Sequence, residues 1–290
     1  MTKKIVVVYN PTSGSGRGNK QAATFRNFLE RQQLSFSFIE TSFSGDLTTA
    51  LQSEQMDSLV IIGGDGTINE VINAMPDASV PIGIIPAGTG NDFVKTIDTG
   101  KSEKERFDTA IYGEPVNIDA GICNGRKFLN GVGIGFDGQI VAAMMNKKKL
   151  LSGQAAYYYE VLRILSTYRE KPFEFSMDGK NHRENLILLT IANGTTFGGG
   201  FKLTPYADIA DGKLDICEIG KISPISRYLN VLKLQNGTHD RLKAVRMHQV
   251  ESIEIKENPV LNAHIDGEYL GHPPFKIEVL PRHLYIRTKG

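Results

Sequence analysis

The sequence is poor in cysteine and almost without net charge, and each shortage excludes a class of protein. Cys123 and Cys217 are the only two cysteines among 290 residues, which excludes a disulfide scaffold and a cysteine-built zinc module and suits a reducing cytoplasm. With 33 Lys+Arg against 32 Asp+Glu, the formal net charge is +1, which excludes a nucleic-acid binder that works through a global basic field. We therefore expect no nucleic-acid partner.

Long apolar runs are missing as well. The longest of them, such as 186–192, are about seven residues long, far short of the roughly 18–20 residues that cross a bilayer. Residues 1–4 lead directly into a short apolar run and then Asn10-Pro11, a pattern that does not fit a signal peptide. At 40% hydrophobic and 22% charged, the composition is that of a folded globule. We expect a cytoplasmic protein without a transmembrane segment.

The first third of the sequence alternates short apolar runs with helical patterns. Strands are predicted over 5–9, 36–39, 59–62 and 81–85, and helices over 21–33, 46–54 and 68–75, with a further helix start at Asn91-Asp92. Fully apolar strands separated by single helices indicate a parallel sheet covered on both faces. We predict an α/β domain with a doubly wound, largely parallel sheet over residues 1–120, to which a last strand near 283–290 is a candidate to return.

From about residue 116 the pattern changes to strands joined by turns. The strand patterns lie at 116–120, 127–134, 173–177, 186–193, 215–219, 252–256, 263–266, 276–280 and 284–287. Two helices are predicted among them, near 155–168 and 224–235. We predict a second, mainly antiparallel β-rich domain over residues 121–282.

Three glycine-bearing loops follow strands of the predicted parallel sheet, at 10–18, 63–67 and 86–92. Loops at the carboxyl ends of parallel strands share one edge, and each of these loops precedes a helix whose N-terminus favours an anion. Glycines let the backbone approach a phosphate closely. The loops therefore predict a polyphosphate site, although neither a dinucleotide-binding G-x-G-x-x-G pattern nor a Walker pattern fits the sequence.

The second loop places Asp65 between glycines at a strand-to-helix junction. A carboxylate that faces phosphates repels them unless a divalent cation lies between, so Asp65 implies Mg²⁺. The alternative is a plain turn, because most Asp-Gly pairs are turns. Such pairs begin at Asp65, Asp137, Asp178, Asp211 and Asp266. The doubled glycine and the two partner loops favour a site at Asp65.

Five segments, in order along the chain, resemble the diacylglycerol kinase catalytic-domain family, which sphingosine kinases and small bacterial lipid kinases share. They are 10–14, 63–73, 86–93, 210–215 and 266–268. The departures are mild, with Ala74 where a glycine is usual and Lys95 where an arginine is common. The resemblance covers essentially the whole chain and implies a small soluble lipid kinase of the bacterial type.

The resemblance implies ATP as co-substrate and assigns site residues. Those implied for ATP are Asn10, Pro11, Thr12, Ser13, Gly14, Thr41, Gly64, Asp65, Gly66, Thr67, Ile68, Asn69, Glu70 and Thr89. It also implies Asp266 as general base with Glu268 in support, and a placed carboxylate can accept the proton of a hydroxyl.

A structural Mg²⁺ is implied as well. The resemblance assigns it to the side chain of Asp211 and the backbone carbonyls of Asp208 and Lys213, and a hard cation takes such oxygen ligands. The alternative for Asp211-Gly212 is a hairpin turn. The roles of two further residues are not assigned by the resemblance. Arg17 is a candidate phosphate-binding cation or a solvated loop charge. His264 is expected to pack against its neighbours or to orient them rather than to act as a base.

The implied reaction transfers the γ-phosphoryl group of ATP to a lipid hydroxyl, first of all that of diacylglycerol to give phosphatidic acid for phospholipid biosynthesis. The alternatives are an NAD kinase-like phosphotransferase, whose family shares the Gly-Gly-Asp-Gly loop, and a catalytically inactive nucleotide-binding regulator. We expect peripheral contact with the inner face of the membrane through Lys147, Lys148 and Lys149, whose alternative is a solvated charge run. The identity of the lipid and the oligomeric state, a homodimer included, stay open.

Overall fold

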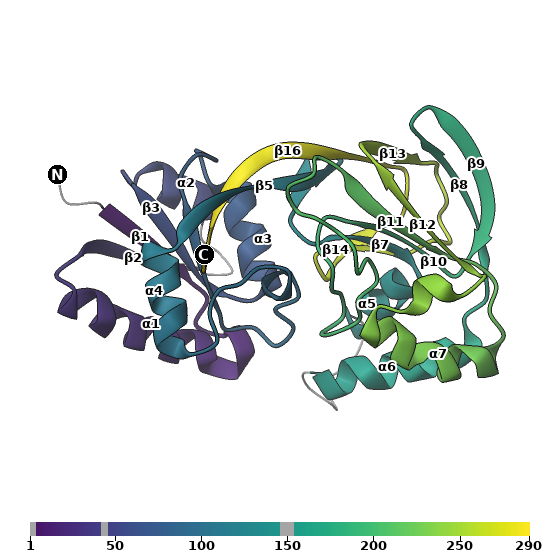
Figure 1. The fold of residues 1–290 in the computed structure, drawn as a ribbon, viewed down its shortest axis with the longest axis horizontal. Helices are drawn as coiled ribbons and strands as arrows, with labels where there is room; N and C mark the ends of the chain where they lie inside the picture. The colour runs from purple at the N-terminus through teal and green to yellow at the C-terminus, as the bar shows by residue number, and fades with distance from the viewer. Residues whose placement is uncertain (1–3, 42–45, 146–153) are drawn as a thin grey trace. The chain divides into compact units, whose positions relative to one another are not determined.

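The computed structural model describes residues 4–41, 46–145 and 154–290. It divides into two compact units, one of Met1–Ile118 with Arg282–Gly290 (unit 1) and one of Asp119–Pro281 (unit 2). The strands β5 (Glu114–Cys123) and β16 (Phe275–Thr288) each begin in one unit and end in the other (Figure 1). The last residues of the chain therefore belong to unit 1.

Unit 1 is a doubly wound α/β structure, as predicted. Its strands are β1 (Lys4–Tyr9), β2 (Ser35–Glu40), β3 (Ser58–Gly63), β4 (Ile82–Pro86) and the end of β16. They pair in parallel in the order β2-β1-β3-β4-β16. Every residue of β3 is buried, because helices cover both faces of the sheet.

The helices of unit 1 lie on both faces of this sheet (Figure 1). They are α1 (Ser13–Arg31), α2 (Leu47–Gln52), α3 (Asp65–Ala74) and α4 (Glu103–Tyr112). Phe25 of α1 and Phe107 of α4 pack together with Val7 and Val60 of the sheet in one apolar cluster. The α2 and α3 helices contact each other and α3 contacts β3, so the second face is covered as well.

The strand order defines where loops meet. From β1 the chain crosses to β2 on one side, and from β2 it crosses to β3 on the other side of β1. The carboxyl ends of β1 and β3 therefore form the switch point of the sheet, where open α/β sheets bind ligands. The loop that follows β4 is the next neighbour of this point.

One predicted helix of unit 1 is wrong. Asn91-Asp92 precedes only the short 3₁₀ turn η1 (Phe93–Lys95), and the next helix is α4. That helix begins with a capping box, in which the Ser102 side chain accepts the N–H of Glu105 and the Glu105 carboxylate accepts the N–H of Ser102. The spacing Ser102-x-x-Glu105 is the sequence signal for this helix start.

Unit 2 contains the predicted antiparallel β structure. One sheet has the order β12-β11-β10-β7-β14-β15, and its pairs are antiparallel. Its strands are β7 (Gly131–Gly135), β10 (Leu188–Ala192), β11 (Leu214–Ile219), β12 (Val245–Val250), β14 (Ala263–Ile265) and β15 (Glu268–Gly271).

A second layer of strands packs against this sheet through an apolar core. It contains the beginning of β16, then β13 (Ser252–Ile255), β8 (Lys171–Met177) and β9 (Lys180–Leu186), with β6 (Arg126–Phe128) paired to β5. Phe173, Phe175 and Ile277 of this layer share one buried cluster with Ile134 and Ile191 of the other sheet. Unit 2 is therefore a β sandwich.

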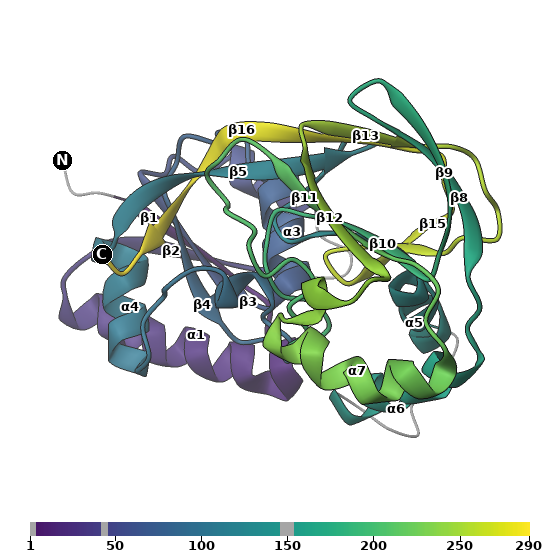
Figure 2. The same cartoon turned by 45° about the vertical axis from the view of Figure 1, so that its right-hand side comes forward.

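Three helices cover the outer face of the six-stranded sheet, as Figure 2 shows. They are α5 (Phe136–Met145), α6 (Gln154–Thr167) and α7 (Pro224–Asn236). Val161 and Leu165 of α6 pack with Leu188 and Cys217 of the sheet. None of the helices in the described part of the chain is long and apolar enough to span a membrane.

In the second part of the chain the sequence patterns missed α5, β9, β12 and β15. They merged β6 and β7 into one strand over 127–134 and divided β16 into two strands. β9 is an edge strand whose residues before Leu186 are polar on both faces, so it carries no alternation of apolar and polar residues. The predicted cationic patch at Lys147, Lys148 and Lys149 lies outside the described residues.

Candidate functional site

The three glycine loops of unit 1 touch one another at the carboxyl edge of the sheet. A Cβ on Gly88 would lie 2.5 Å from the Cα of Gly64, and a Cβ on Gly14 would lie 2.1 Å from the carbonyl oxygen of Ala87. Only glycine permits these approaches. The loops after β1, β3 and β4 are therefore packed into one structure, as their place in the strand order predicts.

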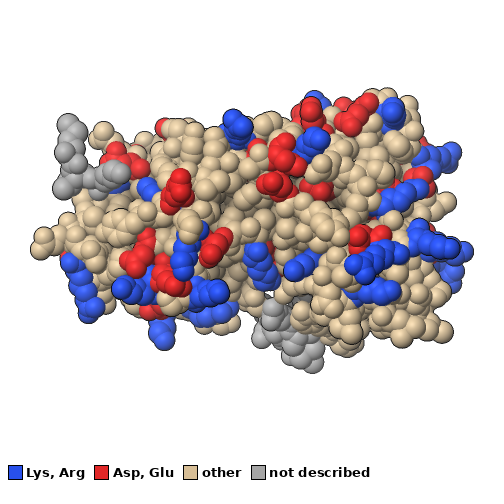
Figure 3. All heavy atoms as spheres, viewed as in Figure 1, with Lys and Arg blue, Asp and Glu red and all other residues tan. Residues whose placement is uncertain are grey.

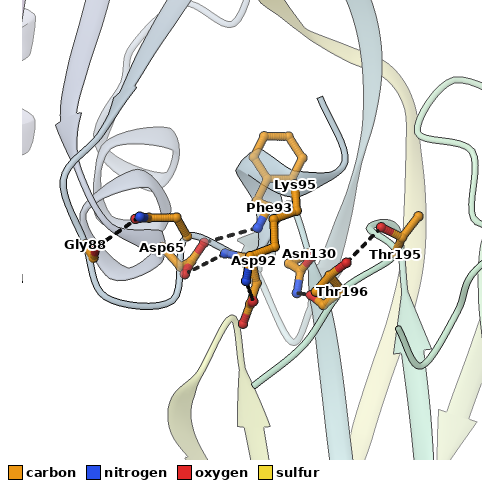
Figure 4. Close-up of polar contacts among 9 residues, drawn as sticks. Asp65, Gly88, Asp92, Phe93, Lys95, Asn130, Thr195 and Thr196 are labelled. Atoms are coloured by element: carbon orange, nitrogen blue, oxygen red, sulfur yellow. Dashed lines mark hydrogen bonds and ion pairs between the residues drawn. The ribbon is translucent and has the colours of Figure 1, made fainter. Parts of the chain in front are cut away.

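Two charged side chains tie these loops together. The Asp65 carboxylate accepts the backbone N–H groups of Asp92 at 3.0 Å and Phe93 at 3.2 Å (Figure 4). The Arg17 guanidinium donates to the carbonyl oxygens of Gly14 at 3.2 Å and Gly88 at 2.6 Å. Asp65 thus holds the third loop, and Arg17 joins the first loop to the third, roles that sequence reasoning missed.

The residues predicted to bind ATP fall into two groups. The side chain of Asn10 accepts the N–H and hydroxyl of Thr12, and the hydroxyls of Ser13 and Thr67 are 3.5 Å apart, which joins the first and second loops. Pro11, Gly14, Gly64, Gly66 and Thr89 lie in or beside the same loops.

The second group, Ile68, Asn69 and Glu70, lies in the helix α3 and not in the glycine loops. Ile68 and Asn69 are buried, at 2% and 1% exposure, whereas Glu70 is exposed.

Thr41 lies directly after β2, and its N–H donates to the carbonyl oxygen of Tyr9 at 2.9 Å. Among the described residues, its hydroxyl is buried and has no hydrogen-bond partner. A buried hydroxyl without a partner is costly unless something else satisfies it. Thr41 therefore offers a polar group at the same edge of the sheet as the glycine loops.

In unit 2, Asp266 lies in the tight turn between β14 and β15 with a left-handed φ of 46°. Its carboxylate accepts three backbone N–H groups, from Leu129 at 3.1 Å, Asn130 at 3.0 Å and Gly131 at 2.9 Å. The residue is 8% exposed. Three donors from one segment fix the position of this carboxylate.

Polar side chains surround this segment. The amide of Asn130 donates to the carbonyl oxygen of Thr196 (Figure 4), and that of Asn193 donates to the carbonyl oxygens of Asp119 and Leu129. In the described structure, the side-chain oxygens of Asn130 and Asn193 are buried without a partner. Sequence reasoning missed both asparagines, since neither stands in a recognisable motif.

His264 and Glu268 flank the Asp266 turn. The Nδ1 atom of His264 accepts the N–H of Gly267 at 3.3 Å, and its Nε2 lies 3.8 Å from the Asp137 carboxylate. His264 therefore braces the turn, which fits the orienting role expected from the sequence. The Glu268 carboxylate forms an ion pair with Arg126 and is about half exposed.

The residues implied for Mg²⁺ lie on the loop before β11 in unit 2. Asp208 accepts the N–H of Ala210, and Asp211 accepts the N–H of Lys213 and the side-chain amide of Gln249. Within the described residues, no three His, Cys, Asp or Glu side chains are arranged to hold a metal ion.

Two further acidic residues, to which sequence reasoning assigned no role, lie beside this loop. The buried Asp119 accepts the N–H of Gly212 at 2.6 Å. Burial raises the pKa of Asp215 to about 6; a hydrogen bond from Gln249 opposes the shift, and the charges of Asp211 and Asp208 add to it. Among the described residues, Asp215 Oδ2 is buried without a hydrogen-bond partner. Neighbouring carboxylates, one with a buried oxygen that has no hydrogen-bond partner among the described residues, are the kind of ligand that a hard cation takes.

Both units match models of known families. A model described as diacylglycerol kinase catalytic domain matches residues 4–123, and one described as YegS C-terminal NAD kinase beta sandwich-like domain matches residues 130–288. The class that these two models define is a kinase with an α/β unit followed by a β sandwich.

Similar proteins cover almost the whole chain. The diacylglycerol kinase of Bacillus subtilis (strain 168) is 29% identical over 98% of this chain and 96% of its own length. That of Staphylococcus carnosus (strain TM300) is 28% identical over 99% and 96%. A crystal structure of a diacylglycerol kinase from Bacillus anthracis str. Sterne has the same fold, with a TM-score of 0.74 at 23% identity over 99% of this chain and 97% of that chain. The chain belongs to the diacylglycerol kinase catalytic-domain family with a YegS-type C-terminal domain, and it is a kinase.

Proposed function

We propose that this kinase transfers the γ-phosphoryl group of ATP to the hydroxyl of a lipid, and that diacylglycerol is the acceptor and phosphatidic acid the product. The observation that carries the proposal is the set of three glycine loops packed together at the switch point of unit 1. The acceptor is taken from the relatives that match the chain over nearly its full length and are named diacylglycerol kinase.

Unit 1 supplies the groups that bind a polyphosphate. Gly64 precedes α3, whose first turn offers backbone N–H groups and the positive end of the helix dipole. The packed glycines remove side chains from this edge, and Thr41 adds a hydroxyl without a partner in the described structure. In this role Asp65 keeps the loops in register through its bonds to the third loop.

Unit 2 supplies the proton acceptor. The three N–H groups that hold the Asp266 carboxylate leave it in one fixed position, and a carboxylate so placed can accept the proton of the attacking hydroxyl. Glu268 supports the turn through its ion pair with Arg126. Positioning and electrostatics account for most of the catalysis of phosphoryl transfer, so a rigid carboxylate suits this reaction.

Mg²⁺ fits the loop before β11. The Asp211 side chain and the backbone carbonyls of Asp208 and Lys213 would hold it, and the ion would relieve the repulsion among the neighbouring carboxylates. We assign Asp215 to the same proposed site, because its buried Oδ2 has no hydrogen-bond partner in the described structure.

An apolar cavity in unit 2 supports a lipid acceptor. It has a volume of about 80 Å³ and lies among α5, α6, α7 and the sheet. Ile140, Val161, Leu165, Val231 and Leu234 are among its apolar lining residues. His264, two residues before Asp266, also lines it. The cavity thus extends from the neighbourhood of the proposed proton acceptor into an apolar region, which suits the end of an acyl chain.

The test is a phosphotransfer assay with labelled ATP and a panel of acceptors in mixed micelles: diacylglycerol, monoacylglycerol, a sphingoid base, phosphatidylglycerol and NAD. We expect labelled phosphatidic acid from diacylglycerol as the main product. Labelled product from NAD alone would identify an NAD kinase-like enzyme instead, and bound ATP without transfer to any acceptor would identify a nucleotide-binding regulator.

A further inference from the structure

The α7 helix carries an exposed apolar face. Ile225, Tyr228, Leu229 and Leu232 are 76, 42, 74 and 66% exposed. Their spacing of three and four residues places them on one side of the helix. Single exposed apolar residues are ordinary, whereas a continuous apolar patch marks a surface that contacts a partner or a membrane.

The α6 helix extends this surface. Tyr159 and Leu162 are 52 and 50% exposed, and the Tyr228 hydroxyl donates to the carbonyl oxygen of Leu162 at 2.9 Å. The exposed apolar residues of the two helices are therefore contiguous. We call Tyr159, Leu162, Ile225, Tyr228, Leu229 and Leu232 the α6–α7 apolar face.

Hydrogen bonds join the two helices beneath this face. The buried guanidinium of Arg227 donates to the carbonyl oxygens of Leu165 and Tyr168, at the end of α6. The opposite side of α7 is apolar as well, since Val231 and Leu234 line the internal cavity. A helix that is apolar on both sides is expected to be buried on both sides.

The exposed charges that α6 and α7 themselves carry have one sign. The sequence of α7 contains no Asp or Glu, and the single acidic residue of α6, Glu160, is buried and paired with Arg163 at 2.7 Å. Arg163 and Lys233 are exposed beside Leu162 and Leu232. Where α6 and α7 lie, Figure 3 shows uncharged residues in tan and Lys and Arg in blue.

We propose that the α6–α7 apolar face inserts into the surface of a lipid bilayer that contains anionic lipids. The leucines and isoleucine enter the boundary between headgroups and acyl chains, and the flanking cations meet anionic headgroups. The inference builds on the proposed lipid kinase function, because the helices that meet the bilayer also line the cavity assigned to the acyl chain. It places membrane contact at residues other than Lys147, Lys148 and Lys149.

The charge pattern favours a bilayer over a second copy of the chain. A twofold dimer through this face would place the same patch of each copy against the other, and so bring Arg163 and Lys233 of both copies together with no exposed acidic residue on either helix. An anionic bilayer instead complements these cations.

The test is sedimentation with phosphatidylcholine vesicles that contain increasing fractions of phosphatidylglycerol, at low and high salt. We expect the wild-type protein to bind more as the anionic fraction rises and less as salt rises. Changing Ile225, Leu229 and Leu232 together to Ser should lower vesicle binding at least about tenfold, because each removes apolar surface from the interface. The matched control changes Tyr112, Val116 and Val260 to Ser, since they are 58, 38 and 54% exposed elsewhere; it should bind vesicles as wild type does.

Two further measurements separate the outcomes. Both triple variants should phosphorylate a short-chain diacylglycerol dissolved as monomers as fast as wild type, which shows that they are folded. Equal vesicle binding by the Ile225, Leu229 and Leu232 variant and wild type overturns the proposal, as does a wild-type dimer that this variant converts to a monomer without losing vesicle binding. Vesicle binding that depends on the face, in a protein that phosphorylates no lipid, supports the docking surface and contradicts the proposed function.

Discussion

Two hairpin turns of unit 2 have the same residues and the same backbone, yet their aspartates differ in burial and in hydrogen bonding. Asp178-Gly179 joins β8 to β9 and Asp266-Gly267 joins β14 to β15, each as a two-residue loop. The φ angles are 47° and 78° in the first turn and 46° and 84° in the second. Positive φ at both positions is the hairpin geometry for which Asp-Gly is favoured.

The difference lies in what surrounds the aspartate. Asp178 is exposed, whereas the carboxylate of Asp266 is buried and accepts three backbone N–H groups. Those donors come from residues more than 130 positions earlier in the chain. The turn geometry is thus a local property, and the fixed carboxylate is a tertiary one.

The largest expected effect comes from removing the charge of Asp266. Asp266→Asn should lower turnover by about 10²-fold or more, because it removes the proposed proton acceptor. It should also lower the free energy of unfolding by about 2 kcal/mol, because an amide cannot accept all three N–H bonds as a carboxylate does. Turnover with labelled ATP and urea denaturation measure the two effects.

The matched control is Asp178→Asn, which keeps the other turn and touches no proposed site. Its turnover and stability should stay close to those of wild type. Turnover of the Asp266→Asn protein within a few-fold of wild type would remove Asp266 from the reaction and leave it as a structural residue.

A third Asp-Gly pair, Asp211-Gly212, extends the comparison to the proposed Mg²⁺ site. If Mg²⁺ binds there, it should raise the free energy of unfolding of the wild-type protein by about 2.7 kcal/mol when its concentration is about 100 times its Kd. Asp211→Ala should abolish this stabilisation, which thermal melts with and without Mg²⁺ measure. An equal Mg²⁺ response in the mutant and in wild type would leave Asp211-Gly212 as a plain loop.

Asp215 gives the same region a dependence on pH. Its pKa is raised in the folded state, from 3.8 to about 6, so the folded protein binds a proton more tightly than the unfolded chain does. Without Mg²⁺, this residue should therefore increase stability as the pH falls from about 6 towards 4. Denaturation across this range should show a smaller increase in Asp215→Asn, and an identical profile would show that Asp215 does not titrate there.

The smallest effect concerns the glycines of the two hairpins. Neither Gly179 nor Gly267 has a neighbour within 4 Å of an added Cβ, so only the left-handed backbone opposes a side chain. Gly179→Ala and Gly267→Ala should each cost about 1 kcal/mol in urea denaturation. A clearly larger loss at Gly267 would mean that the turn beside Asp266 is under constraints beyond its backbone.

Much of unit 1 is predictable from the sequence because its signals are local. Apolar runs such as β3, followed by glycine loops and helical spacing, define a parallel sheet and place the loops on one edge. The helix start expected at Asn91-Asp92 is wrong, since only the 3₁₀ turn η1 follows it, and the N–H groups of Asp92 and Phe93 bond to Asp65. No pattern in the sequence predicts the contact of Asp65 with these N–H groups.

Unit 2 was predicted less completely. The edge strand β9 is polar on both faces, and the pair Asp137-Gly138 lies within the helix α5 rather than in a turn. Asn130, Asn193 and Asp119 belong to no motif, and Asp215 ends the segment 210–215 without a role implied for it. These residues become candidates only through burial and the partners that their side chains have or lack.

The sequence by itself determined the kind of backbone in the segments with strong local signals, because apolar periodicity, glycine and Asp-Gly turns act over a few residues. Only the tertiary structure decided what each Asp-Gly pair does. Asp65 holds a loop, Asp137 lies in a helix near His264, Asp178 is exposed, Asp211 faces Gln249 and Asp266 is fixed by three N–H groups. The reason is physical: hydrogen-bond donors and burial come from residues distant in the chain, and the folded structure alone brings them together.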